Sequence, residues 1–588
     1  MLPMDKTEWF RNAEYGFFFH FLNTGGTSLA PEASSPRNSA SPAAWNRTVD
    51  SFDVERLAAQ MHELKAGYVF LTVGQNSGYY CSPNAAYDRI TGNSGEASTC
   101  SKRDLVADFA DALAEYGIPL LAYTTTLAPA FDFNAVEKFK SIPPWNCNAN
   151  CHNYNEVKRF AGTDPRLREF QEMWSAVHAE WAARWGRKVR GWWVDGCYFA
   201  PRMYAFPDPP NGRSFAAALR AGNPDALVAF NPGVVYPPRA VDSCQDYLAG
   251  EINEPEYGIL NGPLIGGMQY HVLSYAGKTW GKLPLRGDAR FYAAATRNIV
   301  DNGGVMTWDL PFTPDGIADK VFAVLKEFVR DYAAGKEAFP KTTVQVTSPY
   351  WDGDGTGIPG KVELASERPA ELTLEWNGVK TVLEPSSGPV ELPLPPPRST
   401  ECRLNLSCGG FSRGIAVPVG RNLILTEQPS NPLELETRDR SRMLARYRCS
   451  VKDDVFYVDA EIFESEPDLR AQPWACSCLE LFLSPDGVFR TQFCIRHDCA
   501  MFQVDNSAVE PCSGIRVSKE VAAEGILRLL CAVPLSLAGG CGAGEFRFEI
   551  QQSINCGGQV LRNCLFGTRA QPEFARVRIA SPAGRALR

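Results

Sequence analysis

Two acidic residues that follow apolar segments could carry acid–base chemistry. Asp195 ends a run of large aromatic residues (WWVDG), and Glu251 lies further along the chain in the loop sequence GEINEPEYG. Hydrolysis of a glycosidic bond requires such a pair, because one carboxylate attacks the sugar while a second carboxyl group protonates the leaving oxygen. The sequence therefore predicts Asp195 and Glu251 as the two carboxyl groups of such a reaction. Capping of the next element is the alternative for Asp195. Glu254 and Glu256 compete with Glu251 for the second role, and a solvated loop charge is the alternative for any of these three glutamates.

Further polar and aromatic residues lie where other apolar runs end, and their side chains suit a sugar. Imidazole, amide and phenol groups exchange hydrogen bonds with hydroxyls, and the flat apolar face of an indole can stack on a sugar ring. A histidine satisfied within the core, and tryptophans of ordinary core packing, are the alternative interpretations. The predicted substrate-binding residues are His20, Gln75, Asn76, Tyr123, Asn231, His271, Trp280 and Trp308.

The elements that must position these residues alternate between short apolar runs and amphipathic segments, which is the pattern of repeated β–α units. The segment VERLAAQMHELKAG, for example, places its apolar residues at helical spacing. Eight such runs predict an α/β fold, a (β/α)8 TIM-like barrel over residues 1–338, whose catalytic groups gather at the carboxyl ends of the strands. The runs begin near Phe17, Tyr68, Ile118, Val189, Ala226, Asp246, Gly266 and Gly304.

The pattern changes after the predicted barrel. Short alternating segments such as KVELAS and ELTLEWNG, broken by glycine and proline, predict a small β-sandwich over residues 339–427. A second boundary falls near the sequence QPSNP. The strand-like segments DVFYVDAEIF and EFRFEIQQSI that follow predict another β-sandwich over residues 428–588. The sequence therefore predicts three domains, of which the barrel is the catalytic one.

Composition narrows the class of protein. The chain has 588 residues, with Lys+Arg 59 against Asp+Glu 67 and a formal net charge of −8. This mild acidity argues against a nucleic-acid partner, and no apolar run is long enough to predict a membrane span. No dinucleotide or phosphate-binding glycine motif is present, so we expect no cofactor. The oligomeric state is left open. The sequence as it stands has no secretory signal pattern and predicts a cytoplasmic protein, whereas a removed signal would make it periplasmic or secreted.

The cysteines bear on compartment and metal binding. Ten of the 18 lie between Cys449 and Cys564. Buried thiols that act as small hydrophobic groups are the favoured interpretation, and disulfides of an exported protein are the alternative. Cys147, Cys151 and His152 have no second Cys/His pair at zinc-finger spacing, so no metal site is expected.

Several segments resemble the α-L-fucosidases of glycoside hydrolase family 29, over roughly residues 5–335. EYGFFFHF resembles the opening of that family, LKAGYVFLTVGQNSGYY and SKRDLVADF the next block, and GWWVDG the strand that carries the catalytic aspartate. DYLAGE resembles the acid/base segment of some members, and KTWG and DNGG resemble the last two blocks. The resemblance implies a nucleophile at Asp195, an acid/base at Glu251, a sugar contact at His20, and retention through a glycosyl–aspartate intermediate.

Three positions depart from the family pattern. The family presents a His-His pair where this chain has Gln75 and Asn76, a basic residue where it has Pro232, and a Trp-Glu pair where it has Tyr270 and His271. Amide side chains still exchange hydrogen bonds with hydroxyls, so a sugar site is expected. These departures bear on whether the sugar is fucose.

The C-terminal region resembles a carbohydrate-binding module of the family 9 type, through Asp454–Val458 and through Pro473 and Trp474 ahead of CLELFL. Trp474 is its predicted exposed aromatic. The whole sequence thus predicts a retaining exo-glycosidase, α-L-fucosidase-like, whose partner is a carbohydrate substrate. The alternatives are a glycosidase for another sugar and a non-catalytic glycan-binding protein.

Overall fold

The fold is known from a computed structural model, which describes most of the chain in separate segments. Cys147, Cys151, His152, Glu256 and Trp474 lie outside the described residues. The described residues are 6–23, 41–129, 132–141, 166–197, 204, 206–234, 238–255, 262–352, 356–383, 389–397, 401–437, 441–469, 476–485, 491–505, 508–538, 541, 544–566 and 575–579.

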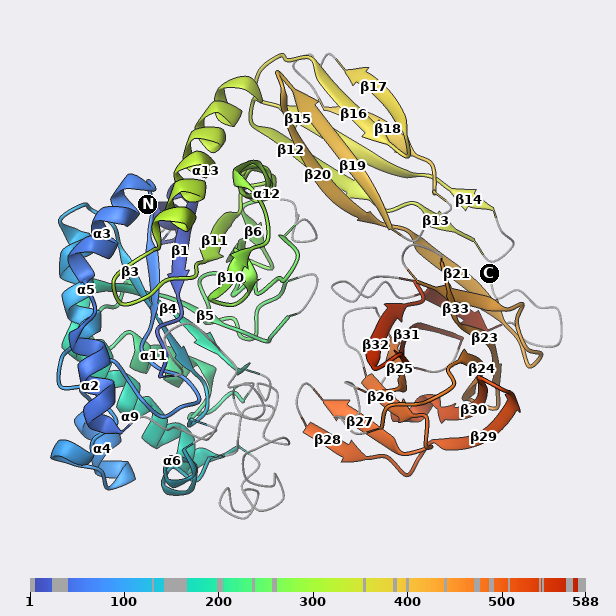
Figure 1. The fold of residues 1–588 in the computed structure, drawn as a ribbon, viewed down its shortest axis with the longest axis horizontal. Helices are drawn as coiled ribbons and strands as arrows, with labels where there is room; N and C mark the ends of the chain where they lie inside the picture. The colour runs from blue at the N-terminus through green and yellow to red at the C-terminus, as the bar shows by residue number, and fades with distance from the viewer. Residues whose placement is uncertain are drawn as a thin grey trace.

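Seven parallel strands form one sheet in the N-terminal region, in the order β5-β4-β3-β2-β1-β11-β8 (Figure 1). They are almost entirely buried, which explains why each reads as a continuous apolar run rather than an alternating one. Seven of the eight predicted runs contain one of these strands. The strands are β1 Tyr15–Phe19, β2 Val69–Thr72, β3 Leu120–Thr125, β4 Val189–Asp195, β5 Leu227–Phe230, β8 His271–Tyr275 and β11 Val305–Asp309.

The predicted run at residues 246–251 forms isolated bridges instead of a strand. The backbone N–H of Asp246 donates to the Val228 carbonyl of β5 at 2.9 Å, and Glu251 makes a parallel bridge to Leu273 of β8. The segment therefore lies between the two edge strands of the sheet. Complete closure into an eight-stranded barrel stays a prediction.

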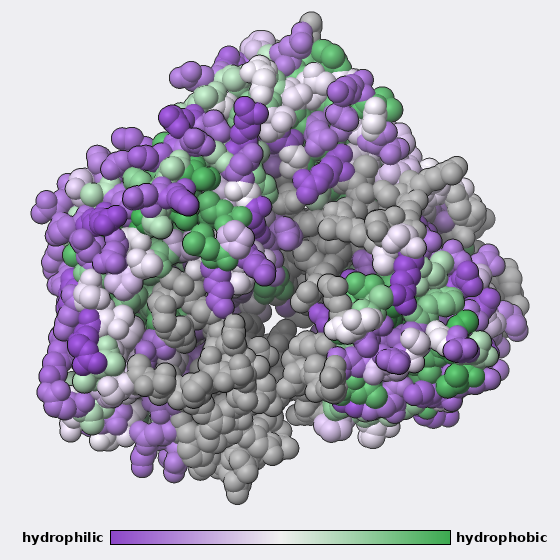
Figure 2. Space-filling view, in the orientation of Figure 1, coloured by the Kyte–Doolittle hydropathy of each residue, from purple (hydrophilic) through white to green (hydrophobic). Residues whose placement is uncertain are grey.

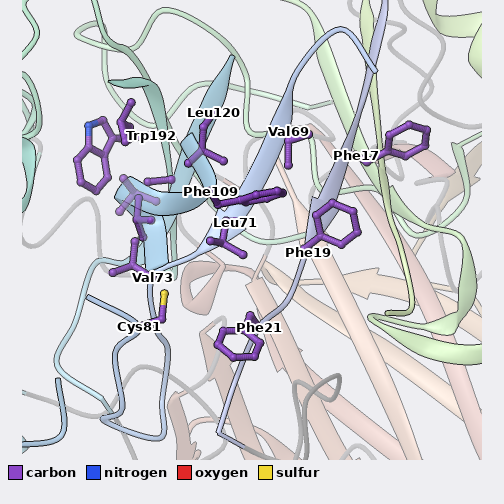
Figure 3. Close-up of a cluster of buried hydrophobic side chains, with 14 of the residues drawn as sticks. Phe17, Phe19, Phe21, Val69, Leu71, Val73, Cys81, Phe109, Leu120 and Trp192 are labelled. Carbon is purple, nitrogen blue, oxygen red and sulfur yellow. The ribbon is translucent and has the colours of Figure 1, made fainter. Parts of the chain in front are cut away.

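The sheet is strongly curved and carries apolar side chains on both faces. The rings of Phe18 in β1 and Trp193 in β4 lie 6.3 Å apart although two strands separate β1 from β4, so these side chains meet on the inner face. Neighbouring strand residues such as Phe17 and Trp192 point the other way, toward the helices, and belong with Phe109 of α5 to one buried cluster between the sheet and the helices (Figure 3). This alternation decides which strand residues can reach a site at the mouth of the sheet.

Helices cover the outer face of the sheet. Several begin with a side-chain cap: Asp53, Asp104 and Asp288 accept hydrogen bonds from the first turns of α3, α5 and α12. Their outer surface is mostly hydrophilic in Figure 2. The helices of the described segments are α1 Glu8–Asn12, α2 Pro42–Asp50, α3 Val54–Glu63, α4 Ala85–Thr91, α5 Leu105–Ala114, α6 Phe133–Lys138, α9 Arg168–Trp185, α11 Gly212–Leu219, α12 Ala289–Asp301 and α13 Asp319–Ala338, with 3-10 turns at Gly95–Ala97 and Gly186–Lys188 and, in the C-terminal region, at Leu535–Leu537. Helix α1 is the exception to the outer position, because its Phe10 packs with the inner-face cluster.

Helix α13 leads from this sheet to two smaller antiparallel sheets, which share one hydrophobic core that includes Val362, Leu374 and Leu406 (Figure 1). The first sheet holds β12 Thr342–Thr347, β15 Gly360–Ser366 and β18 Val390–Leu394. The second holds β16 Leu372–Trp376, β17 Val379–Leu383, β19 Glu401–Cys408 and β20 Phe411–Pro418.

Two further sheets enclose the C-terminal core. The smaller one holds β22 Leu433–Glu436, β23 Met443–Lys452, β24 Val455–Phe463, β29 Arg516–Ala523 and β30 Ile526–Pro534. Three strands of the larger sheet come from residues before 427, so this sheet crosses the predicted boundary, and the three-domain division stays a prediction. The larger sheet holds β13 Tyr350–Trp351, β14 Gly357–Ile358, β21 Gly420–Leu425, β25 Cys478–Ser484, β26 Thr491–Arg496, β27 Met501–Asp505, β28 Ala508–Pro511, β31 Glu545–Cys556, β32 Gln559–Cys564 and β33 Ala575–Ile579.

Two expectations from the sequence concern membrane-spanning segments and the state of the cysteine thiols. Of the helices in the described segments, none is both long and apolar enough to cross a bilayer. The cysteines in these segments are free thiols, and most are buried.

Candidate active site

Asp195 ends β4 and is almost completely buried, with 8% of its surface exposed. Its Oδ2 accepts a hydrogen bond from the Tyr123 hydroxyl at 2.6 Å. Its Oδ1 accepts from the backbone N–H of Gly196 and from the side-chain amide of Asn231, both at 2.8 Å. Three donors stabilise the ionised form of a carboxyl group and fix its orientation. The environment of Asp195 is therefore that of an ordered anion.

Glu251 shares a hydrogen-bond donor with Asp195. The Nδ2 atom of Asn231, the residue that follows β5, donates to Glu251 Oε2 at 2.7 Å and to Asp195 Oδ1 at 2.8 Å. The two carboxylate oxygens can therefore be no further apart than these two bonds laid end to end, about 5.5 Å. Three of the predicted site residues thus meet at one nitrogen atom.

Gly250 allows Glu251 to approach β8 closely. Its φ is 64°, in the left-handed region, and a Cβ built there would lie 1.9 Å from the carbonyl oxygen of His271. Glycine fits this position because it has no Cβ. The backbone of Gly250 accepts from the Leu273 N–H at 2.8 Å, which fixes the loop at the point where Glu251 begins.

The two carboxyl groups have different electrostatic environments. The pKa of Glu251 is raised from 4.5 to about 8, first by burial and second by the negative charge of Asp195. The pKa of Asp195 is also raised, because the effect of burial exceeds that of the hydrogen bonds from Tyr123, Asn231 and Gly196 and of the nearby His20 imidazole, which lower it. At neutral pH, Glu251 is therefore the member of the pair that holds a proton.

Tyr123 and Gln75 form a layer beneath Asp195. The ring of Tyr123 stacks on Trp193 at 5.3 Å between centroids and 17° between planes. The Gln75 side-chain amide donates to the Tyr123 hydroxyl oxygen, while that hydroxyl donates to Asp195. Gln75 therefore supports the Tyr123 hydroxyl, and its direct contact with a sugar hydroxyl stays a prediction.

Asn76 has an unsatisfied polar atom next to this layer. Its side chain is buried, with 4% of the residue exposed, and its Oδ1 makes no hydrogen bond to any residue that the structure describes. A buried amide oxygen without a donor costs free energy, so a bound hydroxyl at this position would be favourable.

His20 follows β1 and connects the site to β11. Its Nδ1 lies 2.6 Å from Asp309 Oδ1, and its ring packs against Phe18 and Tyr123. Trp280, which is partly exposed, packs edge-on to His20 with 5.7 Å between ring centroids. Trp280 lies in the turn between β9 Gly277–Thr279 and β10 Lys282–Leu285. The pairing of His20 with Asp309 has no signal in the sequence, because the two residues lie at the ends of strands that are far apart in the chain.

The positions of two predicted binding residues require correction. His271 was expected at a carboxyl end, but β8 begins there, and its ring bonds to the carbonyls of Leu248 and Ala249 and to the Thr307 hydroxyl. Its pKa is lowered to about 4 by burial. His271 therefore belongs to the interior of the sheet at the end away from Asp195.

Trp308 faces the helices rather than the mouth of the sheet. Its Nε1 donates to Thr296 Oγ1 of α12 at 3.0 Å, and its ring lies 5.0 Å from that of Tyr292. The residue is 1% exposed and belongs to the core between the sheet and the helices. The predicted sugar contact of Trp308 is therefore wrong, because the Trp308 side chain points toward the helices and the next residue, Asp309, points into the site.

Within the described segments, no group of three or more His, Cys, Asp or Glu side chains is arranged to hold a metal ion. The site is thus built from two carboxyl groups, three amides, a phenol, an imidazole and an indole. Such groups can transfer protons, attack an electrophilic carbon and bind hydroxyls.

No family model matches this sequence, and no curated protein does. Among solved structures, the endo-fucoidan hydrolase MfFcnA4 from glycoside hydrolase family 107 is 13% identical with a TM-score of 0.41, over 98% of this chain and 99% of that chain. Endo-fucoidan hydrolase MfFcnA9 of the same family is 14% identical with a TM-score of 0.40, over 98% and 100%. The α-L-fucosidase AlfC from Lactobacillus casei, in complex with α-L-fucose, is 14% identical with a TM-score of 0.41, over 56% of this chain and 99% of that chain.

Proposed function

We propose that this chain is a retaining glycoside hydrolase that releases a terminal sugar from an oligo- or polysaccharide, with Asp195 as nucleophile and Glu251 as general acid/base. The observation that carries the proposal is the shared amide of Asn231, which keeps an oxygen of each carboxyl group within about 5.5 Å of the other. Retaining glycosidases have their two carboxyl groups about 5–5.5 Å apart, whereas inverting enzymes leave about 6.5–9.5 Å for a water.

In the first step, a carboxylate oxygen of Asp195 attacks the anomeric carbon as the bond from that carbon to the leaving oxygen breaks. Glu251 gives its proton to the leaving oxygen, so the alcohol departs neutral and Asp195 becomes the ester of a glycosyl–enzyme. The raised pKa of Glu251, about 8, supports this role because the proton is still present at neutral pH.

In the second step, Glu251 acts as a base. The ester carries no negative charge, and the loss of that neighbouring charge lowers the pKa of Glu251. Its carboxylate takes a proton from a water molecule whose oxygen attacks the anomeric carbon and displaces Asp195. The two displacements together retain the anomeric configuration and return both groups to their starting states.

α-L-Fucose is the first candidate for the terminal sugar, because of the resemblance to family 29. The imidazole of His20 and the free Oδ1 of Asn76 would hold ring hydroxyls, and the apolar face of Trp280 suits the methyl group of a 6-deoxy sugar. The replacement of the family's His-His pair by Gln75 and Asn76 makes other terminal sugars the second candidates.

The test is a screen of aryl α-L-fucosides, galactosides, arabinosides and rhamnosides, followed by NMR of the first sugar anomer released. We expect one of these glycosides to be hydrolysed, and the sugar that is released first to have the same anomeric configuration as the substrate. Initial release of the opposite anomer would contradict the retaining mechanism. Saturable sugar binding with no hydrolysis of any substrate would instead favour a non-catalytic glycan-binding protein.

A further inference from the structure

Asp309 ends β11, beside β1 in the sheet, and is completely buried. Both of its carboxylate oxygens are engaged. Oδ1 lies 2.6 Å from His20 Nδ1, and Oδ2 accepts a hydrogen bond from the backbone N–H of Gly281. Gly281 directly follows Trp280 in the turn between β9 and β10. One carboxylate therefore contacts two separate parts of the site.

The contact with His20 determines where the imidazole carries its proton. An ionised carboxylate has no hydrogen to give, so the N–H of this bond must belong to Nδ1 of His20. In the neutral imidazole, Nε2 is then left as the acceptor that a bound hydroxyl can use. The rings of Phe18, Tyr123 and Trp280 surround the imidazole and limit its rotation.

The contact with Gly281 determines where Trp280 lies. The β9–β10 hairpin has only two paired positions and a register shift between them, so its own hydrogen bonds hold it weakly. Asp309 adds a charge-assisted bond at its turn. The indole of Trp280 rests on Tyr275 and on His20, with ring centroids 5.2 Å and 5.7 Å apart.

We propose that Asp309 is a positioning residue that sets the tautomer of His20 and anchors the Trp280 hairpin, so that the hydroxyl-binding nitrogen and the stacking ring keep a fixed relation. The sugar-binding role of these two groups rests on the proposed function, whereas the arrangement itself does not. Asp309 would touch neither the substrate nor the reacting atoms and would act through His20 and Trp280.

The isosteric variant Asp309→Asn tests this arrangement sharply. A side-chain amide has one acceptor atom and one donor group, so it can satisfy His20 Nδ1–H or Gly281 N–H but not both. If the amide oxygen stays with Gly281, His20 must shift its proton to Nε2. If the oxygen stays with His20, the Gly281 bond is lost and the hairpin loosens.

The first measurement needs no activity. The chain has 6 histidines, so 15N labelling of histidine gives few signals, and His20→Gln identifies the one that matters. With the ring neutral, we expect wild-type His20 to be protonated at Nδ1. Hydrogen exchange followed by mass spectrometry then reports the protection of residues 277–285. We expect Asp309→Asn to change either the tautomer or this protection.

Asp246→Asn is the matched control, because it makes the same change at an aspartate with three donors at the opposite end of the 246–251 segment. It should alter neither the His20 tautomer nor the exchange of the hairpin. An Asp309→Asn protein with both properties unchanged overturns the proposal. So does a wild-type His20 protonated only at Nε2.

Kinetics separate this proposal from the proposed function. With a substrate from the aryl glycoside screen, Asp309→Asn should lower kcat/KM about 10–100-fold, mainly through KM, because misplaced binding groups cost about that much. In the His20→Gln background, Asp309→Asn should lower kcat/KM by a smaller factor than it does in the wild-type protein. Full additivity would contradict action through His20. If no substrate is hydrolysed, the proposed function fails, while the tautomer and exchange measurements still decide the role of Asp309.

Discussion

Asp195 and Glu251 accept hydrogen bonds from the same nitrogen, Nδ2 of Asn231, at 2.8 Å and 2.7 Å. The shared donor keeps two carboxyl groups close together whose charges repel each other, so they cannot both ionise without cost. Asp195 has two further donors, whereas Glu251 is affected chiefly by burial and by the charge of Asp195. The asymmetry assigns the anion to Asp195 and the proton to Glu251.

Replacement of Asp195 tests the nucleophile. Asp195→Ala should lower kcat at least about 10³-fold, because no other group can form the glycosyl ester. Azide in the emptied space should restore turnover and give a glycosyl azide of inverted configuration, which NMR of the product identifies. The wild-type enzyme in the same azide is the control and should give no inverted azide. Full activity of Asp195→Ala would remove this residue from the mechanism.

Replacement of Glu251 tests the acid/base through pH dependence. Glu251 must be protonated to act as an acid, so kcat/KM should fall as the pH rises through about 8. Glu251→Gln cannot titrate, and its profile should lack this alkaline limb. In Glu251→Gln, kcat should fall strongly for a glycoside with a poor leaving group. It should fall little for a dinitrophenyl glycoside, because dinitrophenolate departs without a proton. The matched variant Glu254→Gln should keep the alkaline limb of the wild-type profile. Loss of this limb in Glu254→Gln and its retention in Glu251→Gln would make Glu254 the general acid/base.

Two tryptophans at similar places in the sequence should behave differently. Trp280→Ala removes a partly exposed ring next to His20 and should raise KM about tenfold, the equivalent of about 1.4 kcal/mol. Trp308→Phe loses the bond to Thr296 and some packing, and should cost about 1–3 kcal/mol of stability with KM unchanged. Steady-state kinetics and thermal unfolding of both variants check this contrast. Equal rises in KM would place Trp308 in the site after all.

The differences between expectation and structure have a common physical origin. A residue that ends an apolar run can be identified from the sequence, which is why Asp195 and Asn231 were found. The side on which a strand residue lies depends on the register, because neighbouring residues alternate between the two faces. Asp309 faces inward, so Trp308 must face the helices. His271 was misplaced because its run was read as beginning at Gly266, five residues before β8 starts.

Contacts between strands far apart in the chain could not be predicted from the sequence. The pairing of β1 with β11 brings His20 to Asp309, and no local pattern links these two positions. The same holds for Gln75, whose amide meets Tyr123 only because β2 lies beside β3. The sequence indicates which residues can do chemistry, while the sheet order determines which of them act together.

The final prediction concerns the junction between α12 and β20. Asp301 of α12 is buried and accepts hydrogen bonds from the guanidinium groups of both Arg297 and Arg413, the latter at 2.8 Å, and from the Thr342 N–H. Asp301→Asn would leave two buried arginines without their anion, and should cost about 3–5 kcal/mol. Arg413→Met leaves Asp301 paired with Arg297, so it should cost less, about 1–2 kcal/mol. Denaturant unfolding of the full chain measures both values, and kcat/KM of the folded protein should stay unchanged. An equal cost for the two substitutions would contradict the role of Asp301 as the anion that both arginines need.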